Sequence, residues 1–288
     1  MFDRILFPTD GGDGTDATLD HVLDLAADHG ATVHVLYVAD TTHDSVTRIG
    51  RDVVDVLEQE GEEAVEAVAE RAADRGVETV TAVLQGGVAE TISAYVDEKG
   101  VDLIAMPTRG RSGLDRLLLG STTERVVREA TVPVLSLRPD DGPARYPYRN
   151  VLVPTDGSER ATAALRRGVE IAARADATLH VLSVVDLGSV GIEAYSGTDA
   201  LVEAAEETVA EAAAVAEEAG VEVVEHVEVG SSPARGIRTY VEDHDVDLVA
   251  MGTQGRTGVE RYLLGSVAER TVRTSPVPVL TVPDTDDD

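Results

Sequence analysis

The chain has 288 residues, of which 43% are hydrophobic, enough to build the cores of one large or two ordinary globular domains. Asp and Glu number 54 against 24 Lys and Arg, so the formal net charge is -30. This acidic excess excludes a protein that binds nucleic acid or an anionic membrane surface through basic side chains. Cysteine is absent, which excludes disulfides, thiolate nucleophiles and cysteine ligands for a metal.

The acidic charge is spread evenly along the chain. Residues 1–144 carry 28 acids against 12 bases and residues 145–288 carry 26 against 12, while Lys99 is the only lysine. This composition resembles that of proteins from organisms with molar salt in the cytoplasm, where a Debye length of ~3 Å screens the repulsion. An ordinary acidic protein is the alternative. The N-terminus has no leader pattern and no stretch approaches ~18 apolar residues, so we expect a cytoplasmic protein without membrane contact.

In chain order, short β-branched runs alternate with longer helical patterns. In the first half, strands are expected at residues 5–8, 32–38, 78–84, 103–106 and 134–137. Helices are expected between them at residues 17–29, 53–75, 88–99 and 121–129. The second half offers the same series, with an alanine-rich helix across 200–219. This alternation predicts an α/β fold with doubly wound parallel sheets, which bind ligands at the carboxyl ends of their strands.

The second half repeats the first. Residues 4–11, RILFPTDG, return as residues 150–157, NVLVPTDG, at an offset of 146, and a later pair of segments matches at an offset of 145. This period is too long for a solenoid repeat and indicates a duplicated domain. Four segments are therefore predicted in order: a domain at 1–140, a stiff polar linker at 141–147, a domain at 148–284, and a solvated acidic tail at 285–288.

The loop after the first strand of each copy reads Pro-Thr-Asp-Gly and places Asp10 or Asp156 at the carboxyl end of a buried strand. An aspartate there can cap the following helix by accepting a backbone N–H, and for the loop taken alone we favour this interpretation. The alternative is that the carboxylate accepts hydrogen bonds from the hydroxyl or amino groups of a ligand.

The loop after the fourth strand carries the strongest signal. The second copy reads Gly252-x2-Gly255, then nine residues, then Gly265-Ser266. Glycines let the backbone approach a phosphate chain and direct N–H groups toward it. Ser266 opens a helix over 267–273, whose N-terminus attracts anions, and its hydroxyl is expected to serve both as the N-cap and as a phosphate donor. A loop without a ligand is the alternative.

Together with the closing Val-Pro-Val-Leu segments at 132–135 and 277–280, these motifs resemble the universal stress protein family over nearly the whole chain. The resemblance implies two tandem five-stranded, Rossmann-like domains of the adenine nucleotide alpha-hydrolase type, a role in the stress response, and ATP as the ligand; Mg2+ beside the nucleotide stays open. By position, Asp156 and Val184 would lie beside the adenine and ribose, with Gly252 at the ribose and phosphates. The full set implied for the second copy is Thr155, Asp156, Val184, Met251, Gly252, Gly255, Gly265, Ser266 and Val267.

The first copy departs from the motif because Pro107 stands where Gly252 stands in the second. Proline has no N–H to donate and adds bulk where the backbone must approach the ligand. One lost donor costs ~1–3 kcal/mol, roughly tenfold to a hundredfold in affinity. We therefore expect ATP mainly in the second copy. A weak first-copy site would comprise Asp10, Val38, Gly110, Gly120, Ser121 and Thr122.

No catalytic or metal-binding residue is expected. The chain has no Walker lysine, and His34 and His180, at equivalent strand positions, are interpreted as packing residues. A nucleotide-binding regulatory protein is therefore the favoured interpretation. A slow ATPase using Asp10 or Asp156 and a ligand-independent interaction module are the alternatives.

The closing strands at 132–137 and 277–282 are apolar, and in the family the last strand is a sheet edge used for dimerisation. We therefore predict that the two copies pair through these edges as a pseudo-dimer within the chain. A further dimer of chains stays open, and the sequence names no protein partner.

Overall fold

The computed structural model divides between Tyr146 and Pro147 into two compact units, called here the first and the second unit. The structure describes residues 2–12, 16–40, 51–109, 119–138, 144–187, 198–253 and 264–283, with the main chain alone at 51–56. The division falls inside the segment predicted as a linker. Residues 141–143 of that segment and the acidic tail lie outside the described residues.

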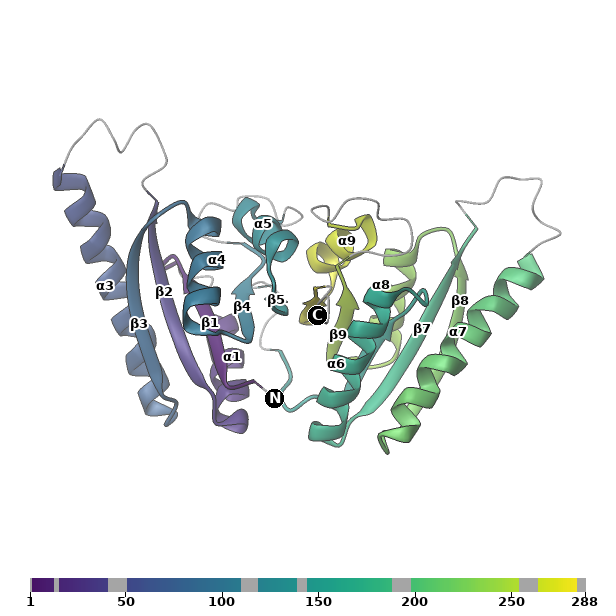
Figure 1. Cartoon of the computed structure of the whole chain (residues 1–288). Helices are drawn as coiled ribbons and strands as arrows, with labels where there is room; N and C mark the ends of the chain where they lie inside the picture. The colour runs from purple at the N-terminus through teal and green to yellow at the C-terminus, as the bar shows by residue number, and fades with distance from the viewer. Residues whose placement is uncertain are drawn as a thin grey trace. The chain divides into compact units, whose positions relative to one another are not determined.

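The first unit is built on one parallel sheet with the strand order β3-β2-β1-β4-β5 (Figure 1). Its elements in chain order are β1 (Arg4–Thr9), α1 (Asp16–His29), β2 (Thr32–Asp40), α3 (Arg51–Asp74), β3 (Thr79–Gly86), α4 (Val88–Lys99), β4 (Leu103–Pro107), α5 (Ser121–Glu129) and β5 (Val134–Leu137). The order reverses direction between β1 and β4.

The second unit repeats this topology in a sheet with the order β10-β9-β6-β7-β8. Its elements are β6 (Asn150–Pro154), α6 (Glu159–Ala175), β7 (Thr178–Asp186), α7 (Thr198–Glu218), β8 (Val223–Gly230), α8 (Pro233–Asp243), β9 (Leu248–Gly252), α9 (Ser266–Thr274) and β10 (Val279–Val282). The prediction of two doubly wound five-stranded α/β domains is confirmed.

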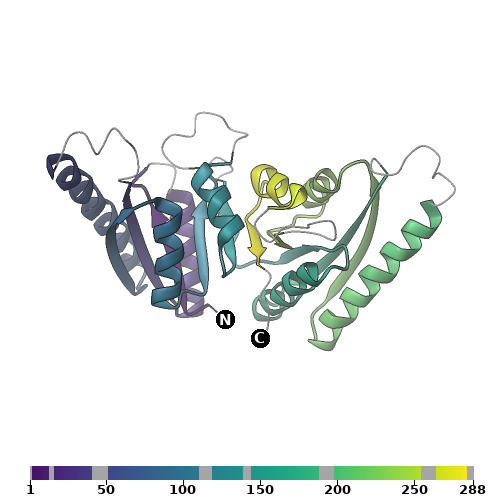
Figure 2. The ribbon, with the colours of Figure 1, turned by 45° about the horizontal axis from the view of Figure 1, so that its top comes forward.

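The helices of each unit lie in two layers. In the first unit α1 and α3 cover one face of the sheet and α4 and α5 cover the other (Figure 2). Right-handed crossovers require this division, because the chain moves toward β3 through α1 and α3 and toward β5 through α4 and α5. In the second unit α6 packs with α7, and α8 packs with α9.

The central strands supply the core. Ile5, Leu6 and Phe7 of β1 are fully buried, as are the three central residues of β6. The outer strands β3 and β8 are half exposed, as expected for strands with a neighbour on one side only. None of the described helices combines the length and the apolar character that crossing a membrane takes.

Part of the predicted linker packs against α1 of the first unit. The ring of His21 is buried, lies edge-on to Tyr146 with ring centroids 5.7 Å apart, and hydrogen-bonds the backbone of Ala144. The Tyr146 hydroxyl donates to Asp28 Oδ2 at 2.9 Å. Burial lowers the pKa of His21 to about 4, with the Ala144 hydrogen bond opposing the shift. Ala144 and Tyr146 therefore pack on α1 as part of the first unit.

Candidate functional site

In each sheet the pairing stops short of the carboxyl ends of the two strands at which the strand order reverses. β6 and β9 are in register only at Val151 with Leu248 and at Leu152 with Val249, although β9 continues to Gly252. β1 and β4 share the same two-residue contact in the first unit. Strands that separate at their carboxyl ends at a reversal point form the usual ligand crevice of doubly wound sheets. The Asp156 turn follows β6 at this point, and the start of α9 hydrogen-bonds Thr253 at the end of β9, so we call the place between them the candidate crevice.

The Asp156 loop forms a tight turn in front of α6. Thr155 Oγ1 accepts from Gly157 N at 3.1 Å, and Asp156 Oδ1 accepts from Ser158 N at 3.0 Å. Gly157 has φ 73°, a left-handed conformation that favours glycine. Ser158 is the N-cap of α6 and accepts from Ala161 N at 3.2 Å.

The interpretation of Asp156 as the cap of the following helix is therefore wrong. The aspartate lies two residues before the cap and fixes the turn instead. Sequence reasoning missed Ser158, although a serine directly before a helical pattern is an ordinary N-cap signal.

The first unit builds the same turn from equivalent residues. Thr9 Oγ1 accepts from Gly11 N at 3.1 Å, and Asp10 Oδ1 accepts from Gly12 N at 2.9 Å. Gly11 has φ 69°. The turn is therefore a property of the repeated sequence, and both units place a half-buried aspartate at the crevice.

Gly252 ends β9 against the first turn of α6. A Cβ at this position would lie 2.9 Å from the carbonyl oxygen of Arg160, closer than real Cβ atoms approach. The glycine is thus required by close packing of the chain as well as by any ligand. A larger residue there would displace α6 or the end of β9, and both border the crevice.

Gly265 and Ser266 form the start of α9, but in other roles than predicted. Gly265 is the N-cap, in an extended conformation, and Ser266 is the first helical residue. The prediction of Ser266 as the N-cap is therefore wrong. The N–H of Gly265 donates to the carbonyl of Thr253 at 2.8 Å and closes the base of the loop.

The backbone at the start of α9 still presents hydrogen-bond donors. The first helical amides have no acceptor within the helix, and no described side chain caps this end. Ser266 is exposed and Val267 is half-buried, so their amides lie near the surface. Such an end combines donors with the positive pole of the helix dipole, which favours an anion.

The remaining predicted residues of the second unit lie at or near the ends of β6, β7 and β9. Val184 lies near the end of β7, where a Cβ added to Gly236 of α8 would lie 3.2 Å from its methyl groups. Met251 is buried in β9 and contributes to the core. Thr155 N donates to Leu182 O at 2.8 Å, which joins the Asp156 turn to β7. Gly255 and Gly110 lie outside the described residues.

The first unit differs at the end of β4. Pro107 is buried, and its carbonyl accepts from the buried hydroxyl of Thr123 at 3.0 Å. The second unit has Ala268 at the position of Thr123 and lacks this bond. Arg109 follows and is also buried. Gly120 is the N-cap of α5, and its N–H donates to Thr108 O at 2.9 Å. Ser121 and Thr122 form the first turn of α5. Val38 lies near the end of β2.

Two histidines lie away from the crevice, near the start of β2 and of β7. His34 Nδ1 lies 3.0 Å from the hydroxyl of Tyr95, and His180 Nδ1 lies 2.9 Å from that of Tyr240. Both rings are 7% exposed, and burial lowers the pKa of both. These histidines pack as predicted. Among the described residues no group of three or more His, Asp or Glu side chains is placed to hold a metal ion.

Known proteins resemble this chain in sequence. A universal stress protein of Methanocaldococcus jannaschii is 38% identical over 145 residues, which cover 48% of this chain and 83% of that protein. One from Bacillus subtilis is 34% identical over 148 residues, which cover 48% of this chain and 100% of that protein. These relatives match about half of the chain, the length of one copy.

Solved structures and a family model extend the likeness to both copies. The crystal structure of a universal stress protein from Archaeoglobus fulgidus covers 97% of this chain and 98% of its own, with a TM-score of 0.74 and 26% identity. A functionally unknown protein from Pseudomonas aeruginosa, at 20% identity and a TM-score of 0.69, shares the fold. The model of the universal stress protein family matches residues 1–138 and again residues 147–283. The chain therefore belongs to the universal stress protein family and carries two family domains in tandem.

Proposed function

We propose that the protein binds ATP and that the second unit provides the main site. The observation that carries this proposal is the crevice between β6 and β9, bordered by the uncapped first turn of α9. Amides at a helix N-terminus bind phosphate without any lysine, which suits a chain with a net charge of -30. The Asp156 turn lies on the other side of the crevice, where its carboxylate would meet the ribose and adenine.

The residues present fit the nucleotide. Gly252 allows the closest approach of backbone along the crevice, and Ser266 and Val267 would meet the phosphates with their amides. Because no cluster of carboxylates among the described residues is placed to hold a metal, any Mg2+ would be carried mainly by the phosphates and water.

The first unit would bind ATP weakly or not at all. Pro107 removes a donor at the position of Gly252, and the hydroxyl of Thr123 holds the proline carbonyl. Arg109, two residues after the end of β4, is buried as well. We expect one tight site per chain.

A reciprocal exchange of these two residues tests the assignment. Isothermal titration calorimetry of the wild-type chain with ATP should give one tight site, and Gly252→Pro should weaken it at least tenfold. Pro107→Gly is the matched variant, and it should strengthen binding by the first unit. Two equally tight sites in the wild type would contradict the assignment, and no ATP binding in any variant would contradict the function.

We further propose that ATP is bound without rapid turnover. Both strand-end aspartates accept a backbone N–H of their own turn, Asp10 from Gly12 and Asp156 from Ser158, and this fixes their orientation. A slow ATPase is the alternative. Phosphate release from labelled ATP, with Asp156→Ala as the control, distinguishes them, because hydrolysis that is lost with Asp156 would establish an enzyme.

A ligand-independent interaction module is the other alternative. Binding at a hundredfold excess over Kd should stabilise the second unit by ~2.7 kcal/mol. An unfolding midpoint unchanged by ATP would therefore favour the interaction module. The pairing of the two copies through their closing strands and the cytoplasmic location stay predictions.

A further inference from the structure

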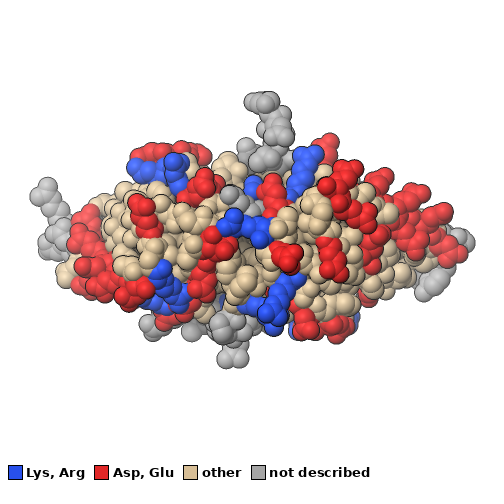
Figure 3. Space-filling model, turned by 90° about the horizontal axis from the view of Figure 1, so that it is seen from below, with Lys and Arg blue, Asp and Glu red and all other residues tan. Residues whose placement is uncertain are grey.

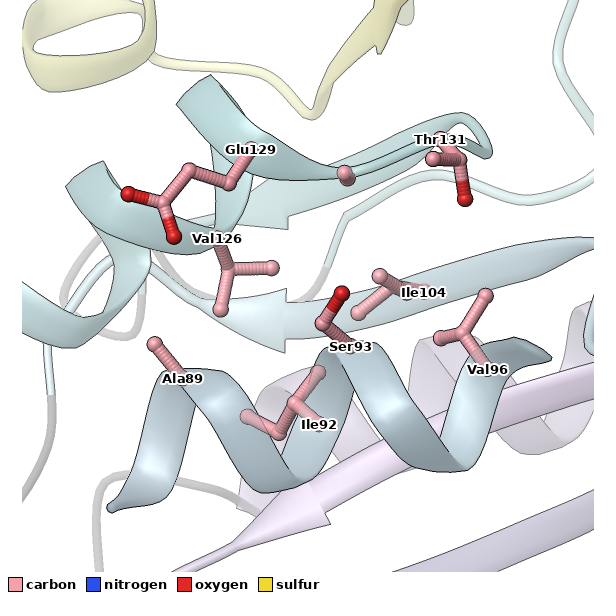
Figure 4. Close-up of a pocket in the computed structure, with 9 residues that line it drawn as sticks. Ala89, Ile92, Ser93, Val96, Ile104, Val126, Glu129 and Thr131 are labelled. Atoms are coloured by element: carbon pink, nitrogen blue, oxygen red, sulfur yellow. The ribbon is translucent and has the colours of Figure 1, made fainter. Parts of the chain in front are cut away.

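The last two helices of each unit pack against each other and carry unlike charges in the two copies. In the first unit Arg125 of α5 forms an ion pair with Glu90 of α4, with Nη1 and Oε1 2.6 Å apart. The same guanidinium contacts Glu129, one turn further along α5, at 3.1 Å. Figure 4 shows the small pocket between these helices, with Glu129 on α5 among the residues that line it. The arginine is therefore neutralised from both sides.

The second unit keeps the arginine and lacks both carboxylates. When the two copies are aligned at the offset of 145, Arg270 stands at the position of Arg125. Arg235 stands at the position of Glu90, and Thr274 stands at the position of Glu129. α8 packs against α9 as α4 packs against α5, and Glu90 reaches Arg125 across the two helices of the first unit, so by position Arg235 and Arg270 are expected to face each other. Both are exposed. Among the residues that the structure describes, neither guanidinium has a hydrogen bond or ion pair.

Neighbouring acids are engaged elsewhere. Glu269, beside Arg270 in α9, faces Arg273 at 4.0 Å, and Glu228 of β8 lies 3.4 Å from His226. The first turn of α8 contains no acidic residue, whereas α4 has Glu90 in its first turn. Figure 3 shows how widely acidic side chains cover one face of the chain. Two neighbouring arginines that no described carboxylate pairs with are therefore an exception on this acidic protein.

We propose that Arg235 and Arg270 form an anion site that binds a phosphate group. A dianionic phosphate matches two guanidinium groups in charge, and its oxygens match their planar arrays of donors. The positive end of the dipole of α8, which begins at Pro233, adds to the attraction. Arg235 and Arg270 lie on α8 and α9, whereas the proposed nucleotide site lies between β6 and β9, and the proposal does not require ATP there.

Inorganic phosphate is the probe for a test by nuclear magnetic resonance. The Nε–Hε signals of Arg235 and Arg270 should shift and saturate as phosphate replaces chloride at constant ionic strength, while that of Arg125 should not. Arg235→Glu recreates the ion pair of the first unit and should weaken phosphate binding at least tenfold. Arg270→Gln gives a second, charge-removing variant that keeps most of the side chain.

The reciprocal change supplies the positive control. Glu90→Arg combined with Glu129→Thr removes both carboxylate partners of Arg125 and should make the Arg125 signal respond to phosphate. An Arg270 signal that does not respond in the wild type, or that responds equally in Arg235→Glu, would overturn the proposal. So would a response of the arginines to ATP alone that disappears in Gly252→Pro, because it would assign them to the nucleotide crevice.

Discussion

Acid should destabilise the first unit through His21. Its pKa is lowered by burial from 6.5 to about 4, so the folded unit holds the ring neutral over a range in which the unfolded chain protonates it. The contribution of the neutral His21 to the unfolding free energy is therefore fully present above pH 6.5 and is lost as the pH falls toward 4. At about 1.36 kcal/mol per pH unit, the complete loss amounts to about 3 kcal/mol. At pH 5 about 2 kcal/mol of it should already be gone.

The assay compares wild type with His21→Phe, which keeps a ring against Tyr146 but cannot titrate. Urea unfolding is measured at pH 7.5 and pH 5. Hydrogen exchange of the amides in β1, β2 and β4 serves as the readout, because it reports the unfolding free energy of the first unit. Wild type should lose about 2 kcal/mol more than the variant over this interval. Tyr146→Phe, which retains His21, should behave as the wild type does. Equal losses in wild type and His21→Phe, or a His21 ring that titrates near 6.5, would refute the reasoning.

Three further predictions concern packing, strand anchoring and salt. Gly252→Ala should lower the unfolding free energy of the second unit by about 1–3 kcal/mol in urea titrations, because its Cβ would lie 2.9 Å from Arg160 O. An unchanged unfolding free energy would show that α6 can shift to admit the Cβ without loss of stability. Asp247→Ala should lower the unfolding free energy of the second unit by about 1–3 kcal/mol, because Asp247 Oδ2 accepts from Arg149 N at 2.7 Å and from Asn150 N at 3.1 Å. Asp247→Asn keeps an oxygen acceptor and should recover part of the lost unfolding free energy. Lowering KCl from ~1 M to ~0.1 M should lower the Tm, because the Debye length grows from ~3 Å to ~10 Å around a chain of charge -30, whereas a constant Tm would favour an ordinary acidic protein.

Local periodicity and duplication explain how much of the fold was predictable. The helix expected at 53–75 is α3, Arg51–Asp74, and the helix expected across 200–219 is α7, Thr198–Glu218. Each pattern occurs twice at nearly constant offset, so an ambiguous segment in one copy is resolved by its partner. The strand order then follows from the handedness of the crossovers.

The candidate site was less predictable because its hydrogen bonds join residues that are distant in sequence or differ only in their place in a turn. The bond from Gly265 N to Thr253 O closes a loop of more than ten residues, which no local pattern indicates. Ser158 and Asp156 are both good caps by residue type, and only the turn geometry decides between them. Arg235 could have been found by aligning the two copies, because a glutamate stands at its equivalent position.

The duplication also changes what a substitution can do. In a dimer of identical chains, every substitution enters both sites at once, so a proline at one phosphate loop would disable both. Here Pro107 and Gly252, like Glu90 and Arg235, differ at matching positions of one polypeptide. A single translation product therefore carries two copies that differ at these positions, in a fixed one-to-one ratio whatever the concentration of the protein in the cell.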